Sequence, residues 1–187
     1  MRQFPTTILI GIIGMVAIGM FLRLSVKRQK APSNAMVELR EKVFSITPAD
    51  IGIAPSATHS QVWGVVMEFQ QSGVVVSVVG FADGTTSLYL SSGGGVIGGG
   101  EHPSIKTATT QWLQVAEQHL SEMTPAAEHP FPKLGRVCFY VLTYKGLLTA
   151  DVDEEALKQR SHVLFPIFYA GHEVITQLRL MEEKQRK

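Results

Sequence analysis

The sequence is poor in cysteine and in charge, and it lacks repeats and low-complexity tracts. Cys138 is the only cysteine among 187 residues, which excludes an internal disulfide framework and a cysteine-rich zinc site. Charged residues make up 18% of the chain, against about 25% in a typical soluble domain. The net charge of +1 excludes a strongly basic nucleic-acid-binding chain. Apolar residues make up 45%, enough for a folded core, so we expect one globular domain with a short appendage.

The longest uncharged stretch lies near the N-terminus, from Gln3 to Leu22. A helix of about twenty residues spans about 30 Å, which matches the hydrocarbon thickness of a bilayer. We interpret residues 7–22 as a transmembrane helix that follows a short tail, residues 1–6. The alternative is a cleaved secretory signal, which needs small residues directly after the apolar run. The run ends in Phe21 and Leu22 instead, which favours an uncleaved signal-anchor of a single-pass protein.

Basic residues follow this segment directly. Four of them lie within eight positions: Arg23, Lys27, Arg28 and Lys30. Only Arg2 and the terminal amine precede it, and the side richer in Lys and Arg stays in the cytoplasm. We therefore predict a cytoplasmic C-terminal domain, with the inverted orientation as the alternative. The predicted partners are the lipid bilayer, through residues 7–22, and a protein.

The rest of the chain divides into a linker and a domain. Residues 23–60 are interpreted as a basic juxtamembrane linker with a short helix over 36–44, for which Asn34 is the expected cap. Residues 61–187 are interpreted as a single soluble α+β domain. Residues 43–187 hold ten basic and fourteen acidic residues. A mildly acidic domain is not expected to bind nucleic acid, whose phosphates require basic contacts.

Apolar runs and turn residues predict about five strands and two or three helices in this domain. The strands are expected at 62–69, 74–81, 85–90, 136–143 and 147–150. Helices are expected at 103–123 and after a cap at Asp151 or Asp153, with Pro166 restarting the last one. Short hairpins make neighbouring strands antiparallel, so we predict an antiparallel meander sheet with packing helices. This order of elements resembles that of profilin-like and roadblock-like domains, and no motif supports a shared function.

A glycine-rich segment between the third strand and the helix at 103–123 is the part that folding explains least. The candidate ligand-binding or partner-binding residues are Gly93, Gly94, Gly95, Gly98, Gly99, Gly100, Glu101 and His102. Glycine allows positive φ and close approach of another backbone. The helix N-terminus behind the segment offers free N–H groups that suit an anion. The segment is thus either a tight crossover packed on the domain or a contact for a ligand or partner.

Other chemistry has weaker support. Residues 93–98 match G-x-G-x-x-G, with Glu117 near the spacing of a ribose-binding acid, but a dinucleotide site requires a parallel βαβ unit and hairpin strands precede this segment. Glu101, His102 and His129 lack a close metal-ligand spacing, so surface histidines are the simpler interpretation. Cys138 lies within a predicted strand, where a thiol is buried and unreactive. We predict no catalytic residue, no cofactor and no metal.

Taken together, these features favour an interaction or regulatory module at the cytoplasmic face of a membrane. The alternative is a small-ligand binding domain or an enzyme that uses the glycine-rich segment 93–102 and the helix N-terminus behind it.

Overall fold

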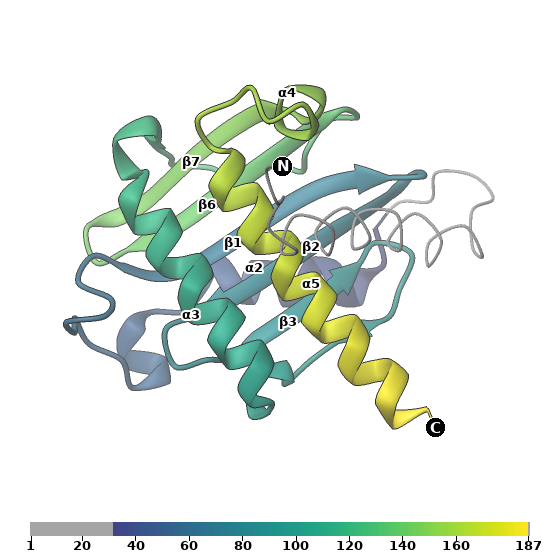
Figure 1. Ribbon diagram of the computed structural model, residues 1–187, viewed down its shortest axis with the longest axis horizontal. Helices are drawn as coiled ribbons and strands as arrows, with labels where there is room; N and C mark the ends of the chain where they lie inside the picture. Colours follow the sequence, from purple (N-terminus) through teal and green to yellow (C-terminus); the bar gives the residue numbers. More distant parts are fainter. Residues whose placement is uncertain (1–31, 187) are drawn as a thin grey trace, which may run out of the picture.

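The computed structural model describes residues 32–186, which form an α+β fold around one antiparallel sheet (Figure 1). Seven strands pair in the order β4-β3-β2-β1-β6-β7-β5. The predicted tail, residues 1–6, and transmembrane helix, residues 7–22, lie outside the described residues. Within residues 32–186, no helix has the length and apolar character that crossing a bilayer requires.

Five of the strands are long, and two have only two residues each. The long strands are β1 (Val62–Gln71), β2 (Val74–Phe81), β3 (Thr86–Leu90), β6 (Arg136–Thr143) and β7 (Gly146–Asp153). The short ones, β4 (Gly95–Val96) and β5 (Thr124–Pro125), lie at the two edges of the sheet. The five predicted strands are confirmed. The edge strands fall in segments predicted as loops, because two residues carry no periodic signal.

The sheet is not a simple meander, so this part of the prediction is wrong. Hairpins join β1, β2 and β3, but β6 pairs with β1, where Val65 lies opposite Val141, instead of with β3. The chain returns through helix α3 (Pro103–Gln118), which crosses one face of the sheet (Figure 1). As a result, β1 and β2 lie near the centre and are buried over eight residues each.

Two long helices, α3 and α5 (Phe165–Gln185), lie side by side on one face of the sheet (Figure 1). Trp112 joins them, because its Nε1 donates a buried hydrogen bond of 3.1 Å to the carbonyl oxygen of Ile167. The short helix α4 (Glu154–Lys158) begins at Asp153, one of the two predicted caps, whose side chain accepts from the backbone N–H of Ala156. Pro166 lies in the first turn of α5, as predicted for a restarted helix.

Three short 3-10 helices complete the structure of the described residues: η1 (Pro48–Ile51), η2 (Gly99–Glu101) and η3 (Leu120–Glu122). The last of these tightens the chain after α3. The predicted helix at 103–123 therefore ends as an α-helix at Gln118.

Helix α2 (Asn34–Ser45) covers the opposite face of the sheet. Met36 and Val43 are buried against sheet side chains that include Trp63 and Tyr140. Its N-cap is Ser33, whose hydroxyl accepts from the Met36 N–H, so the predicted cap at Asn34 is off by one residue. The packed part of the chain thus starts well before residue 61, because a segment predicted as linker forms the helix that packs on this face of the sheet.

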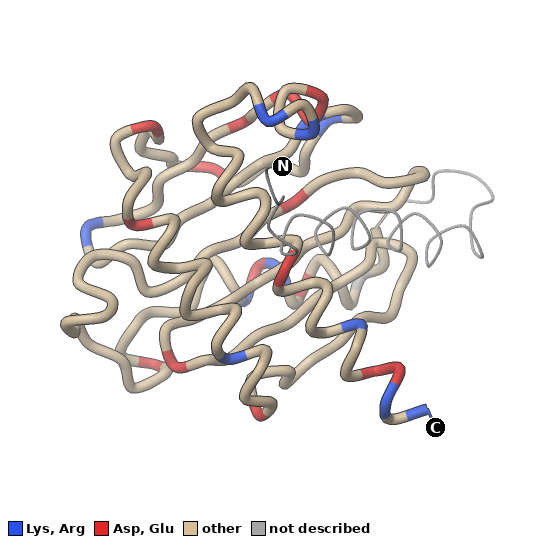
Figure 2. Tube along the Cα trace, viewed as in Figure 1, with Lys and Arg blue, Asp and Glu red and all other residues tan. Residues whose placement is uncertain are grey.

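Charged residues are sparse over the sheet and concentrate at turns and helix ends (Figure 2). Arg40 of α2 is buried and forms an ion pair with Glu68 of β1, which is also buried. This pair attaches α2 to the centre of the sheet.

Candidate functional site

The glycine-rich segment forms a tight turn and then a crossover from β3 to α3. Gly93, Gly94 and Gly98 have φ angles of +94°, +85° and +76°, and a Cβ at any of them would enter open space. Glycine is favoured at such angles because other residues are strained there. These three positions are therefore set by backbone conformation, and the structure places no side chain against them.

Gly95 and Gly100 are set by close packing. A Cβ on Gly95 would lie 2.1 Å from the carbonyl oxygen of Leu88, and one on Gly100 would lie 2.0 Å from that of Gly84. Gly99 is buried, and a Cβ there would lie 2.5 Å from Cδ2 of Leu178 on α5. Packing on the domain itself thus accounts for half of the glycines in this segment.

The polar candidates lie at the end of the crossover. Glu101 is exposed in η2, and His102 precedes α3 without capping it through its side chain. His129 instead contacts Arg40 through Nδ1, 3.0 Å from Nη1. Among residues 32–186, no group of three or more His, Cys, Asp or Glu side chains is placed to hold a metal ion.

Glu117, the acid at dinucleotide-like spacing from the glycines, has a different role. Its carboxylate accepts from the Ser60 hydroxyl and from the backbone N–H groups of Gln61 and Val62, at 3.2 and 3.3 Å for the two N–H groups. These bonds anchor the start of β1 to α3. Since the sheet is antiparallel throughout, the segment 93–98 is not part of a parallel βαβ unit.

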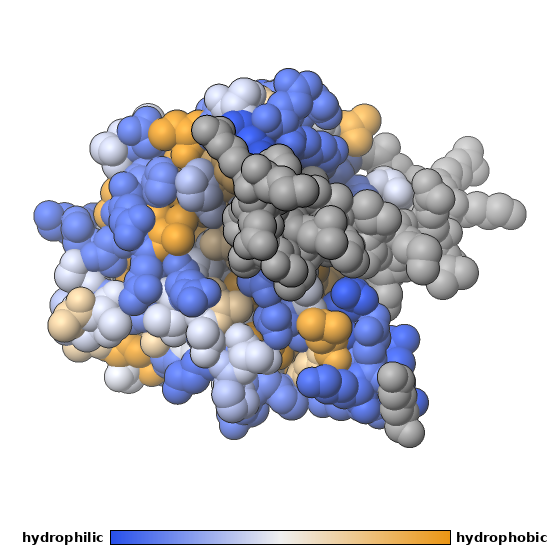
Figure 3. All heavy atoms as spheres, viewed as in Figure 1, coloured by the Kyte–Doolittle hydropathy of each residue, from blue (hydrophilic) through white to orange (hydrophobic). Residues whose placement is uncertain are grey.

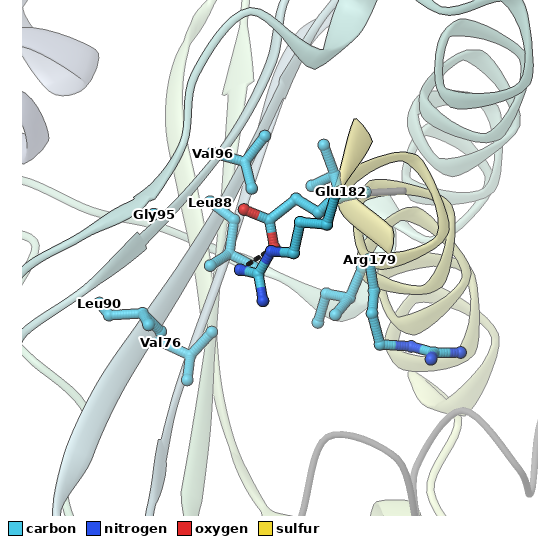
Figure 4. Close-up of a pocket in the computed structure, with 10 residues that line it drawn as sticks. Val76, Leu88, Leu90, Gly95, Val96, Arg179 and Glu182 are labelled. Atoms are coloured by element: carbon cyan, nitrogen blue, oxygen red, sulfur yellow. Dashed lines mark ion pairs between the residues drawn. The ribbon is translucent and has the colours of Figure 1, made fainter. Parts of the chain in front are cut away.

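A cavity of about 230 Å³ lies between β2, β3 and β4 and the C-terminal half of α5 (Figure 4). Six apolar side chains form its walls: Val76, Leu88, Leu90, Val96, Ile175 and Leu178. Two residues of the predicted segment line it, Gly95 and Val96, which together form β4. The glycine-rich segment therefore shapes one wall, while side chains of β2, β3 and α5 supply the others.

Three charged residues at the C-terminal end of α5 lie on one side of the mouth of this cavity: Arg179, Glu182 and Arg186. Glu182 points toward the strands and is paired with Arg186 at 3.9 Å, whereas the guanidinium of Arg179 points away from them (Figure 4). Arg179 is paired at 2.6 Å with Glu183, one helical turn on. The cavity thus joins an apolar interior to a rim that carries charges of both signs.

The surroundings of the cavity are only partly apolar. On the face seen in Figure 3, outside the area covered by grey atoms, hydrophobic residues form separate patches, one of them over the C-terminal half of α5. Leu180 on this helix is 37% exposed. A partner or ligand at the cavity would therefore meet a small apolar area within a polar surface.

The sequence does not predict a cluster of polar contacts that the structure forms around Arg40. Its guanidinium contacts the carboxylate of Glu68, the backbone oxygen of His129 and, at 4.2 Å from the centroid, the ring of Phe131. Glu68 is the one signal in the sequence, because it is a charge within an otherwise apolar strand. Arg40 and Glu68 are both buried, and their contacts attach α2 and the loop before β6 to the sheet.

Cys138 lies beside this cluster and is buried, as predicted. Burial raises the pKa of its thiol to about 11. The thiol is therefore protonated at neutral pH and lacks the reactivity of a catalytic cysteine.

Comparisons of the chain with protein-family models, with curated proteins and with solved structures found no match. The resemblance in element order to profilin-like and roadblock-like domains therefore stays a prediction. Function has to be argued from the site itself.

Proposed function

We propose that this protein is a membrane-anchored interaction module, and that its cavity between β2–β4 and α5 holds an apolar side chain of a partner protein. The observation that carries the proposal is the cavity, with six apolar side chains inside and charged residues at its mouth. Interface hot spots have this anatomy, in which a desolvated anchor lies at the centre and polar groups surround it.

The size of the cavity favours a single side chain over a whole small molecule. Sites for drug-sized ligands measure about 300–1,000 Å³, whereas this cavity measures about 230 Å³. A cavity of about 150 Å³ holds a benzene ring, so a leucine or an aromatic side chain fits. Burying one such side chain contributes roughly 1.5–3 kcal/mol, which suits a reversible contact.

The membrane anchor is the other half of the proposal and rests on the sequence. Residues 7–22 are long and apolar enough to span a bilayer, and the basic residues that follow favour a cytoplasmic domain. Confinement to a membrane raises the effective concentration of partners on the same surface. A contact built on one anchor side chain then suffices for regulation.

A small amphipathic ligand is the second candidate. The charged side chains of Arg179 and Glu182 next to an apolar interior also fit a short apolar tail with a polar head. In that case the bound molecule has a small mass, and no partner protein is needed.

Site-specific photocrosslinking in the full chain, within membranes, tests the two candidates. The photoreactive residue replaces Glu182 at the mouth and, as a control, exposed Glu155 on α4. We expect a protein adduct from position 182 only, attached at an apolar residue of the partner. Val96→Trp fills the cavity and should abolish the adduct while the protein unfolds at an unchanged temperature.

Two results would overturn the interaction proposal. One is equal crosslinking from both positions, and the other is an adduct that persists in Val96→Trp. A small-mass adduct at position 182, seen by intact-mass spectrometry and lost in Val96→Trp, would support the second candidate instead.

A further inference from the structure

A second cavity lies at the other end of α5, where the β1–β2 hairpin meets α4. It measures about 260 Å³ and is lined by side chains from three elements. Phe69 and Phe168 supply aromatic walls, and Gln71, Glu154, Lys158 and His172 are among its polar residues. No function discussed above involves this cavity.

Polar atoms without a partner gather at this cavity. Within residues 32–186, neither ring nitrogen of His172 has a hydrogen-bond partner, although both are out of reach of solvent. The same holds for Oε1 of Gln71. Buried polar groups are nearly always hydrogen-bonded, because leaving them without a partner is destabilising. Three such atoms on two residues that line one cavity indicate that something else satisfies them.

The charges around the cavity favour a neutral ligand. Lys158 is paired with Glu154 at 2.8 Å, so the two charges compensate each other. His172 packs against the rings of Phe168 and Phe69, with centroids 4.3 and 5.4 Å away. Burial, with a smaller effect of Lys158, lowers the pKa of His172 to about 4, which keeps the imidazole neutral at neutral pH.

The missing hydrogen bonds specify the chemistry of the ligand. A neutral imidazole offers one donor and one acceptor, and Oε1 of Gln71 offers a second acceptor. The ligand must therefore carry hydrogen-bond donors and an acceptor, which a primary carboxamide combines in one planar group, and the two phenylalanine rings favour a flat shape. We propose that this cavity binds a small, flat, uncharged carboxamide, which Gln71 and His172 recognise when their side chains turn toward it.

Benzamide is the probe, and benzoate, with the same shape and a negative charge, is its control ligand. The full chain in detergent is titrated with each, and binding is followed by the ¹⁵N signals of the histidine rings. We expect benzamide to shift the His172 signals in a saturable manner and benzoate to bind at least about tenfold more weakly, as loss of a hydrogen bond to a buried group implies.

Variants separate a binding role from a structural one. His172→Phe removes two buried polar atoms without partners, so we expect it to raise the unfolding temperature and to abolish benzamide binding. Gln71→Met should weaken binding in the same way. His102→Phe, at a histidine that does not line the cavity, should change neither property.

Two outcomes overturn the inference. One is the absence of a saturable benzamide shift in the unchanged chain, whichever way the variants move the unfolding temperature. The other is benzoate binding as tightly as benzamide. Neither outcome bears on the cavity at Glu182, so the two proposals fail or stand separately.

Discussion

Arg40 of α2 and Glu68 of β1 form a two-pronged ion pair inside the protein. Nε lies 2.8 Å from Oε1 and Nη2 lies 2.9 Å from Oε2, and the two side chains are 4% and 0% exposed. Ser77 donates a third hydrogen bond to the same carboxylate at 2.5 Å. Burial lowers the pKa of Arg40, but the hydrogen bond and charge of Glu68 outweigh it and raise the pKa above its ordinary value.

Removing one partner of this pair should be strongly destabilising. Arg40→Met leaves the Glu68 carboxylate buried without its counter-charge, which costs roughly 3–5 kcal/mol of unfolding free energy. The double variant Arg40→Met/Glu68→Leu should recover most of that loss, because apolar pairs replace buried ion pairs well. Urea unfolding of the three proteins measures both effects.

A more exposed ion pair with the same Nε to oxygen distance is the control. Arg136 and Asp151 also meet at 2.8 Å, with side chains 35% and 54% exposed. Asp151→Ala should cost less than about 1 kcal/mol, as surface pairs do. If both single variants lose the same stability, burial of the Arg40 pair has no special effect.

Two glycines of the same segment should respond in different ways to substitution. Gly100→Ala places a Cβ 2.0 Å from a backbone oxygen, which cannot move without shifting β3. We expect a loss of at least about 3 kcal/mol in thermal or urea unfolding, in the range of severe core changes. The side chain added by Gly93→Asn enters open space. Because asparagine tolerates positive φ, this variant should lose under about 1 kcal/mol of unfolding free energy. The reverse order would contradict the packing of the crossover.

Stability should fall in mildly acidic solution. The pKa of His172 is about 4 in the folded protein, lowered mainly by burial from 6.5. Between pH 6.5 and 4, the His172 imidazole is protonated in the unfolded chain but not in the folded chain. The unfolding free energy therefore falls as the pH falls through this window. The full drop is about 3 kcal/mol, and burial of His59 lowers its pKa and adds in the same direction.

The variant His172→Phe identifies the source of this pH dependence. Its unfolding free energy, measured in urea at pH 7, 6, 5 and 4.5, should show a shallower slope than that of the unchanged chain. Equal slopes in the two proteins would assign the pH dependence to other groups.

Cys138 should report on unfolding. Its thiol is buried and its pKa is about 11, so at pH 8 almost none of it is the reactive thiolate. Iodoacetamide should therefore modify the folded protein at a rate more than about a hundredfold below that of a free cysteine. Destabilised variants such as Gly100→Ala should react faster, in proportion to their open population. Rapid modification of the unchanged chain would show that the strand pair β1–β6 opens locally.

Local patterns predicted the elements better than their arrangement. The β-branched run of β2 and the turn at Gly73 are local signals, and both predicted the correct hairpin. The pairing of β1 with β6 joins residues far apart in the sequence, such as Val65 and Val141. No local pattern of apolar residues predicts such a pairing. For the same reason the sequence predicts a linker where α2 packs on the sheet, because its short amphipathic pattern does not show which surface it contacts.

The predicted site and the cavity of the proposed function overlap only at β4. Gly95 and Val96 of the glycine-rich segment line that cavity, and a binding role for the segment stays a prediction. The remaining walls come from side chains such as Leu88 and Leu178, whose apolar character in the sequence is that of ordinary core residues. Likewise, His172 is one histidine among six, and only the fold shows that its ring nitrogens lack partners.

In the proposed membrane-anchored protein, the packing of α2 on the sheet would fix the length of chain between the domain and the bilayer. Ser33 already caps this helix, so only residues 23–32 separate it from the predicted bilayer segment. Ten extended residues reach at most about 35 Å, whereas a free linker of residues 23–60 would reach about 130 Å. With residues 7–22 in the bilayer, the domain would stay close to the lipid headgroups. It would then contact only molecules that also lie close to the membrane surface, whatever their affinity for the domain.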